Sequence, residues 1–154
     1  MLLLNGFNGV EALSRPFGFQ LDLLSTDAAV DPAGLLRQPA LLTVHLDGGE
    51  RRLVHGFFSR LTQLGMQDDL AVYRAELVPW LWFLRLSRDS RIFQDMTVPE
   101  IVEDTFTRLG WSDFELRLSR SYSPRLYCVQ YRESHFDFVS RLLEDEGIYY
   151  FFEH

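Results

Sequence analysis

The spacing of the hydrophobic residues changes near the middle of this chain. In the first half, residues 17–25 place apolar side chains at every second position: Phe17, Phe19, Leu21 and Leu23. In the second half, residues 97–110 place them three or four positions apart: Val98, Ile101, Val102, Phe106 and Leu109. The first spacing is typical of a half-buried strand and the second of an amphipathic helix. We therefore expect a strand-rich first half and a helix-bearing second half.

The first half contains signals for further strands and turns. Residues 41–58 alternate on both sides of Asp47-Gly48-Gly49, which predicts a β-hairpin, and residues 70–79 alternate as another strand. Residues 65–69, GMQDD, read as a polar turn, and residues 31–40 as a surface excursion. Several short antiparallel strands joined by such turns indicate a sheet that curls into a barrel or packs on a second sheet.

Two helices in the second half have recognisable caps. Thr97 is followed three residues later by Glu100 and the pattern ends at Gly110, while Ser134 is followed by Asp137 and ends at Gly147. Strand-like segments follow each helix, at residues 114–118 and 148–152, and residues 126–131 alternate as a strand. The two helix-strand segments are either a weak internal repeat or a coincidence of two short amphipathic helices.

These patterns predict an α+β fold, with an antiparallel β-barrel-like first half followed by a helix-strand second half. We expect two lobes, a β-rich lobe over residues 1–86 and an α/β lobe with two helices over residues 87–154. No linker rich in Pro, Gly or Ser separates them.

Composition excludes several classes of function. The net charge of −7 disfavours a nucleic-acid or anionic-membrane partner, because both reward a basic face. No apolar run approaches the roughly 20 residues that span a bilayer. One cysteine allows neither an intrachain disulfide nor a cysteine zinc cluster. The start lacks the basic and apolar regions of a signal peptide, so we expect synthesis and folding in the cytoplasm.

Candidate catalytic and metal-binding residues are few. His45 and His55 lie on the two arms of the predicted hairpin and could approach each other near Asp47, although no third ligand has a diagnostic spacing. Asp137, two residues after His135, is better explained as a helix-capping acid. Cys128, in an apolar strand, is more easily a small buried side chain than a nucleophile.

Two charged segments are unusual. Residues 144–146 place three acids in the last turn of a helix, against the helix dipole, so we expect either solvated charge or an arginine from a neighbouring lobe or subunit. Residues 88–95 place two arginines and two aspartates around Ile92 and Phe93, which suits a tethered connection. No phosphate-binding loop, nucleophile elbow or metalloprotease motif occurs. We predict no catalytic, cofactor-binding or metal residues and no enzyme activity.

Four stretches, at residues 9–25, 51–61, 88–106 and 127–154, resemble the VgrG spike-tip family of type VI secretion systems. The resemblance runs from about Val10 to His154, and the last two stretches are long and rich in aromatic residues. It implies a fold like the hub of contractile phage tails, in which β-barrels with helical insertions form a trimeric ring. It also implies a structural role in contact-dependent effector delivery.

The resemblance implies partners as well. In that family the ring sits between a tube of Hcp hexamers and a needle tipped by a PAAR-domain protein, and it leaves the cell through the type VI machine without a signal peptide. Two alternatives remain open: a baseplate hub or late-control protein of a contractile phage or prophage tail, and, more distantly, a small metal-dependent hydrolase using His45 and His55.

The sequence resembles only the first part of the hub-like region, truncated before a second barrel. Residues 148–152, IYYFF, would then be a strand that continues into that barrel and toward a neighbouring subunit. Because an aromatic edge without a partner tends to self-associate, we expect this chain to be oligomeric or adhesive at micromolar concentration.

Overall fold

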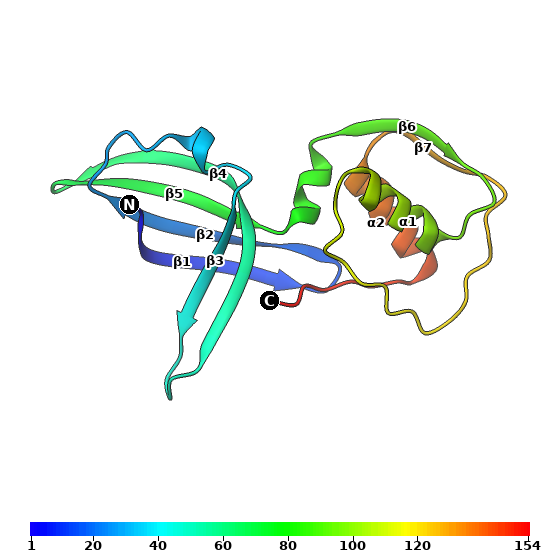
Figure 1. Ribbon diagram of the computed structural model, residues 1–154, viewed down its shortest axis with the longest axis horizontal. Helices are drawn as coiled ribbons and strands as arrows, with labels where there is room; N and C mark the ends of the chain where they lie inside the picture. The colour runs from blue at the N-terminus through cyan, green and yellow to red at the C-terminus, as the bar shows by residue number, and fades with distance from the viewer. The chain divides into compact units, whose positions relative to one another are not determined.

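The computed structural model describes all residues from Met1 to His154 and divides into two compact units (Figure 1). Unit 1 contains residues 1–80 together with 150–154, and unit 2 contains residues 81–149. The last five residues thus belong with the beginning of the chain. The predicted division into a β-rich lobe over 1–86 and an α/β lobe over 87–154 stays a prediction.

Unit 1 is a curled, fully antiparallel sheet with the strand order β1-β2-β5-β4-β3. Its strands are β1 (Leu3–Ala12), β2 (Arg15–Ser25), β3 (Pro39–His45), β4 (Arg51–Gln67) and β5 (Leu70–Val78). The long strand β4 bends and so serves two partners: its first part pairs with β3 and its later part with β5 (Figure 1). The sheet forms a half-barrel, which confirms the predicted barrel-like first half.

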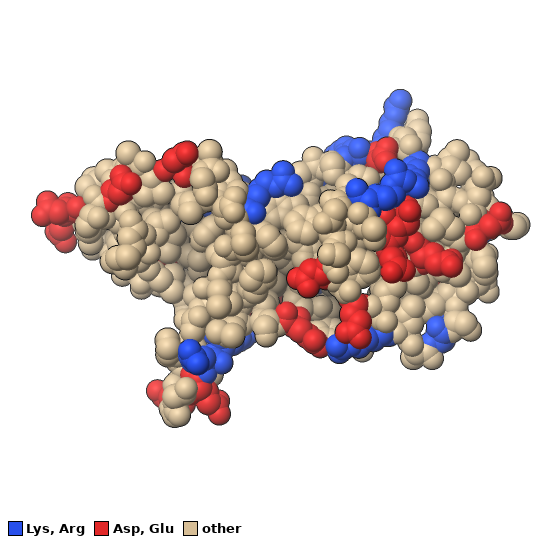
Figure 2. All heavy atoms as spheres, in the orientation of Figure 1, with Lys and Arg blue, Asp and Glu red and all other residues tan.

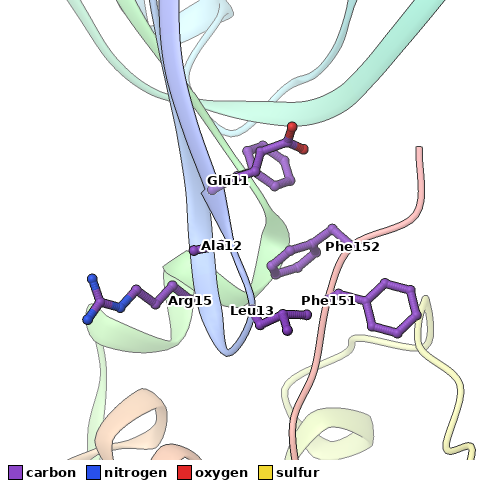
Figure 3. A pocket seen from close by; sticks show the side chains of 7 residues that line it. Glu11, Ala12, Leu13, Arg15, Phe151 and Phe152 are labelled. Atoms are coloured by element: carbon purple, nitrogen blue, oxygen red, sulfur yellow. The ribbon is translucent and has the colours of Figure 1, made fainter.

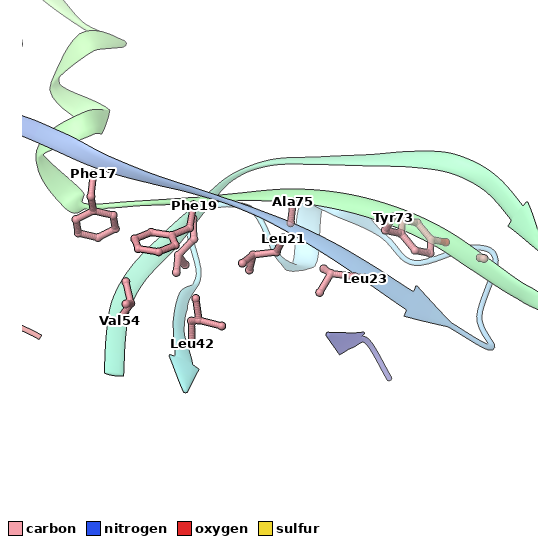
Figure 4. Close-up of a cluster of buried hydrophobic side chains, with 10 residues drawn as sticks. Phe17, Phe19, Leu21, Leu23, Leu42, Val54, Tyr73 and Ala75 are labelled. Atoms are coloured by element: carbon pink, nitrogen blue, oxygen red, sulfur yellow. The ribbon is translucent and has the colours of Figure 1, made fainter. Parts of the chain in front are cut away.

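The core of unit 1 lies on the concave side of this sheet (Figure 4). The alternating residues of β2 and β5 are buried as predicted: Phe17, Phe19, Leu21, Leu23, Tyr73, Ala75 and Leu77. Leu42 of β3 and Val54 of β4 close the cluster from the other end of the sheet. The single-turn helix η1 (Pro32–Gly34) lies on the surface, within the predicted excursion.

The turns of unit 1 confirm one prediction and shift another. Gly48 and Gly49 have φ of +89° and +85°, which explains why glycines occupy the β3–β4 turn. The predicted turn at 65–69 is shorter than expected, because β4 continues to Gln67 and pairs there with Leu70. Asp68, with φ of +52°, makes the reversal.

Unit 2 packs two helices against a two-stranded ribbon. Its elements are η2 (Trp80–Arg85), β6 (Arg88–Phe93), α1 (Val98–Arg108), β7 (Cys128–Ser134) and α2 (His135–Glu146). Both predicted helices are confirmed, and the strand predicted at 126–131 forms instead from Cys128 to Ser134. Phe93 of β6 stacks on Phe138 of α2 with ring centroids 5.5 Å apart, and both rings are buried.

The predicted helix caps are also confirmed. Thr97 and Glu100 form a reciprocal capping box, in which the Thr97 N–H donates to the Glu100 carboxylate over 2.7 Å. The hydroxyl of Ser134 accepts from the Asp137 N–H over 3.0 Å, and Gly147 ends α2 with φ of +66°. No helix of the chain has the length and apolar character needed to cross a bilayer.

The strands predicted at 114–118 and 148–152 do not form. After α2, the Ile148 N–H donates to the Leu143 carbonyl as part of the helix end, and the Tyr150 carbonyl accepts from Ser14, which lies in a turn. A turn offers no row of backbone groups for a ladder, so residues 148–152 run extended without becoming a strand. The suggested internal repeat therefore lacks its strands.

Candidate assembly surfaces

The outermost strand of unit 1 exposes a series of apolar side chains. β1 is paired only with β2, so its other backbone edge has no partner strand in the sheet. Large apolar side chains on or next to β1 lie at least two-fifths exposed: Leu3, Leu4, Phe7, Val10 and Leu13. An edge strand with several exposed apolar side chains is a surface suited to pairing with another chain.

A hollow of about 260 Å³ lies at the end of the β1–β2 hairpin (Figure 3). The hairpin contributes Glu11, Ala12, Leu13, Arg15 and Phe17, and the end of the chain contributes Phe151 and Phe152. Phe17 is buried, whereas Leu13 and Phe151 are more than half exposed. The hollow is therefore lined mainly by apolar groups, with one acidic and one basic side chain among them.

Polar contacts hold the end of the chain against unit 1. The Ser14 N–H donates to the Tyr150 carbonyl over 2.8 Å. His154 accepts at Nδ1 from the His55 N–H over 3.3 Å, and its Nε2 lies 2.8 Å from a Glu11 carboxylate oxygen. Because Nδ1 accepts, the proton of a neutral imidazole is on Nε2 and points to Glu11. Glu11 also pairs with Arg52 of β4.

The approach of His45 and His55 that the hairpin allowed does not occur. In the β3–β4 ladder His45 lies opposite Arg51, and His55 lies opposite Leu41. The two imidazoles are thus four positions apart along the ladder, about 13 Å at the usual strand rise, which is too far to share a metal ion. No group of three or more His, Cys, Asp or Glu side chains is arranged to hold a metal.

In unit 2, a hollow of about 130 Å³ lies between β6, α1 and β7. Gln130, which is 1% exposed, donates to the Glu133 carbonyl over 3.2 Å, and its Nε2 lies 3.3 Å from His135 Nδ1. Burial lowers the pKa of His135, and the charge of Asp89 opposes that shift. His135 thus acts as a neutral member of a buried network.

An ion pair joins β7 to α2. Arg141 donates to both Glu133 carboxylate oxygens, at 2.7 and 2.9 Å, and to the Val129 carbonyl over 2.7 Å. Its guanidinium also lies 5.0 Å from the Phe138 ring centroid. Hydrogen bonding from Arg141 lowers the pKa of Glu133, because the bond favours the ionised carboxylate.

Two of the three acids at the end of α2, Asp145 and Glu146, contact arginines, and these arginines belong to the same unit. Arg125 contacts Glu146 at 3.0 Å and Asp145 at 3.5 Å, and Arg120 donates to the Glu146 carbonyl over 2.6 Å. Hydrogen bonding to Glu146 raises the pKa of Arg125. The segment before β7 therefore supplies the positive charge that the helix end lacks, and a neighbouring lobe or subunit is not required.

The other residues considered from the sequence contribute to packing, to a helix cap and to an ion pair. Cys128 is buried, as expected of a small apolar side chain. Asp137 accepts from the Ser134 hydroxyl over 2.7 Å, which agrees with its role in the cap. In the segment 88–95, Arg91 pairs with Asp104 of α1 at 3.1 Å and lies over the Phe93 ring, so this segment does tether the ribbon to the helix.

Sequence reasoning missed the exposed apolar side chains of β1. Glycines at positions 6 and 9 interrupt the alternation there, and Gly9 packs against the Phe19 ring. The available signal was compositional: several large apolar residues without the period of either a buried strand or a helix.

The profile of a family described as phage tail baseplate hub (GPD) matches residues 10–154. The type VI secretion system spike protein VgrG1b of Pseudomonas aeruginosa is 48% identical over 154 residues, which cover all of this chain and 21% of that protein. VgrG1a of the same organism is 47% identical, and the match covers 24% of its length. The chain thus spans roughly a fifth to a quarter of these relatives.

Two more distant relatives agree. The actin cross-linking toxin VgrG1 of Vibrio cholerae is 33% identical over 162 residues, 99% of this chain and 15% of that protein. A solved structure of the Escherichia coli c3393 protein superposes with a TM-score of 0.83 at 31% identity, covering 99% of this chain and 45% of that one. It is described as a type VI secretion component similar to the bacteriophage T4 tail proteins gp27 and gp5.

Proposed function

This chain belongs to the phage tail baseplate hub (GPD) family, and from that premise we propose that it is a structural part of the hub of a type VI secretion spike. Relatives that are 47% and 48% identical over the whole chain are spike proteins of that system. The family resemblance predicted from the four sequence stretches is confirmed.

The observation that carries this proposal is the apolar, unpaired edge of β1. Val10 is 73% exposed on that strand, and Leu3, Leu4 and Phe7 add further exposed apolar side chains. Exposed apolar surface of this kind often marks a contact with another protein. We propose that it contacts other copies of the chain, as in a trimeric ring, and that the aromatic residues 150–152 lie close to the same contact.

Self-association is tested by sedimentation velocity on the chain and on a form extended to the length of the relatives. Val10→Lys places a charge on the exposed edge strand and should abolish self-association, because edge lysines block strand pairing. Leu64→Lys is the matched control, since Leu64 is half exposed on β4, which β2 and β5 separate from β1 in the sheet. A monomer at every concentration for the extended chain would remove the proposal.

The finer assembly follows from the same proposal. One face of the hub docks on the Hcp tube, while the needle, the PAAR-tip protein and effectors are reached through parts outside this sequence. The chain is made in the bacterial cytoplasm and exported by the type VI machine itself. A pull-down of the extended chain with purified Hcp tests the contact with the tube. Absence of binding between the two proteins at every salt concentration would contradict that contact.

Catalysis is not part of the proposed role. The toxin activity in the name of the Vibrio cholerae relative belongs to that protein, of which the matched region is 15%. The separation of His45 and His55 argues against the metal-dependent hydrolase. Metal analysis of the purified chain tests this point directly, because stoichiometric zinc or manganese would restore the hydrolase.

A second candidate is a hub protein of a contractile phage or prophage tail. The matching family is named for phage baseplate hubs, and the structural relative is described as similar to T4 tail proteins. The neighbouring genes distinguish the two: tail-fibre and tail-tube genes favour a prophage, and type VI sheath and ATPase genes favour the spike.

A further inference from the structure

The β6–β7 ribbon of unit 2 has two faces of different character. Its inner face packs on the helices through Phe93, Cys128 and Gln130, all of which are buried. Its outer face carries Ile92 and Tyr131, which are 55% and 65% exposed. They lie on one side of the ladder, because Ile92 is opposite Val129 and Ser90 is opposite Tyr131. An aliphatic and an aromatic side chain are therefore presented together to solvent.

A β-bulge next to this face directs an arginine onto it. The register shifts between the pairs Asp89–Glu133 and Ser90–Tyr131, so that Arg132 is the extra residue, with φ of +51°. The Ser90 hydroxyl accepts from the Arg132 N–H over 3.2 Å. A side chain other than glycine is uncommon in this conformation, and bulges often re-aim a side chain at a functional surface.

The side chain of Arg132 packs on the ring of the neighbouring Tyr131. The Arg132 guanidinium lies 5.3 Å from the Tyr131 ring centroid, a distance that allows cation–π attraction. Arg88 of β6 reaches across the ribbon, and its Nη1 donates to the Arg132 carbonyl over 3.4 Å. Two arginines, a tyrosine and an isoleucine thus form one surface, which we name the ribbon face: Arg88, Ile92, Tyr131 and Arg132.

The charge of the ribbon face differs from that of the chain. The whole chain carries −7 and contains no lysine, so its positive charge is entirely arginine. Two exposed arginines lie on the ribbon face, and the exposed acid beside them, Asp89, accepts from its neighbour's N–H over 2.7 Å. Figure 2 shows basic side chains gathered over the β6–β7 ribbon. Arginine can bind a carboxylate through two parallel hydrogen bonds, which lysine cannot.

We propose that the ribbon face is a docking surface for a partner protein with acidic side chains around a small apolar contact. Arg88 and Arg132 bind the partner's carboxylates, and Ile92 and Tyr131 cover its apolar centre. Tyrosine and arginine are the residue types most enriched among side chains that dominate binding energy. A protein fits better than a nucleic acid, because the exposed Ile92 between the arginines is matched by an apolar side chain and not by a phosphate backbone. The proposal concerns unit 2 and is independent of self-association through β1.

The test uses two capped peptides as probes, Ac-EELEE-amide and its neutral counterpart Ac-QQLQQ-amide, titrated into the isotope-labelled full chain. The acidic peptide should give saturable NMR shifts of the Ile92 methyl and Tyr131 ring signals. The neutral peptide should bind at least tenfold more weakly, and added salt should weaken the acidic peptide in particular. Absence of saturable shifts at these two residues, or equal binding of both peptides, overturns the proposal.

Variants assign the contact to individual residues. Arg88→Glu and Arg132→Glu should each lower the affinity for the acidic peptide at least tenfold. Arg88 contacts the bulge through one long hydrogen bond, so its substitution disturbs that backbone less than the substitution of Arg132 itself. Arg60→Glu, on an exposed position of β4, is the matched control and should leave binding unchanged. Equal losses in all three variants mean a general charge effect and contradict the proposal.

Two other occupants of the ribbon face, a second copy of the chain and a nucleic acid, would give different results in the same experiment. If Ile92 and Tyr131 shift with protein concentration in the absence of peptide, a second copy of the chain occupies the ribbon face. If a short DNA duplex shifts these signals at lower concentration than the acidic peptide, the face binds phosphates. Either result overturns the proposal. In the first case Val10→Lys would still self-associate through the ribbon face, whereas the second case leaves the sedimentation behaviour expected of Val10→Lys unchanged.

Discussion

The ring of Phe152 packs edge-on against the ring of Phe17, with centroids 5.2 Å apart and planes at 87°. This contact joins the two ends of the chain, since Phe17 begins β2 and Phe152 lies two residues from the last position. Phe152 also packs against the core cluster of unit 1. The end of the sequence is therefore part of the first unit's core, although residues 81–149 form a separate unit between them.

Replacing Phe152 should destabilise unit 1. We expect Phe152→Ala to lower the free energy of unfolding by about 1 to 2 kcal/mol, less than the 3 to 5 of a fully buried Phe because this ring is partly exposed. Urea denaturation measures the change. Val10→Ala, at an exposed position of β1, should change the stability by less than about 0.5 kcal/mol. Equal effects of the two substitutions would show that Phe152 contributes no core packing.

Two glycines of β1 should respond differently to alanine. A Cβ on Gly9 would lie 2.2 to 2.6 Å from carbon atoms of the buried Phe19 ring, whereas a Cβ on Gly6 would meet nothing within 4 Å. Gly9→Ala should therefore destabilise by about 1 to 3 kcal/mol through overpacking, and Gly6→Ala should be neutral or slightly stabilising. Thermal unfolding of the two variants checks the difference, and an equal change in both would contradict the close approach of Gly9 to Phe19.

Local features of this fold could be predicted because neighbouring residues determine them. The alternation from Phe17 to Leu23, the glycine turn at Gly48 and Gly49, and the caps at Thr97 and Ser134 each depend on residues within a few positions. The separation of His45 and His55 could also have been predicted from nearby residues. A turn centred on Gly48 places position 45 opposite 51 and position 55 opposite 41, as the ladder shows.

Features that depend on distant segments could not be predicted. Residues 148–152 have the composition of a strand, but a strand also needs a partner, and they lie beside the turn at Ser14. The arginine that meets Glu146 comes from an irregular segment whose course no periodicity describes. The bulge at Arg132 shifts the register by one residue, and nothing in the alternation of residues 126–131 indicates it.

Removing Arg141 should both destabilise unit 2 and change its response to acid. Arg141→Met keeps the aliphatic stem but loses three hydrogen bonds, so we expect a loss of about 1 to 2 kcal/mol at neutral pH, moderated by the partial exposure of both side chains. Arg60→Met is the control, because its pair with Glu76 is longer and more exposed and should contribute little.

The acid response follows from the lowered pKa of Glu133. A carboxyl whose pKa is lower in the folded than in the unfolded chain stabilises the fold fully above its ordinary pKa of 4.5. That contribution is lost as the pH falls from there through the folded value. Stability measured from pH 7 to pH 2 should therefore decline less steeply in Arg141→Met than in the natural chain, and parallel curves would contradict the coupling.

His135 should make unit 2 sensitive to mild acid. Burial lowers its pKa below the ordinary 6.5, so below pH 6.5 the unfolded chain takes up a proton that the folded chain does not, and stability falls. Asp89 moderates the effect, and Arg91 and Arg108 also line the hollow. His135→Asn places an oxygen where Nδ1 accepts from Gln130 and cannot be protonated. The natural chain should therefore lose stability between pH 7 and pH 5 relative to this variant, and its His135 ring signals in NMR should titrate below pH 6.5. Identical pH curves for the two proteins would mean that His135 is protonated equally in both states.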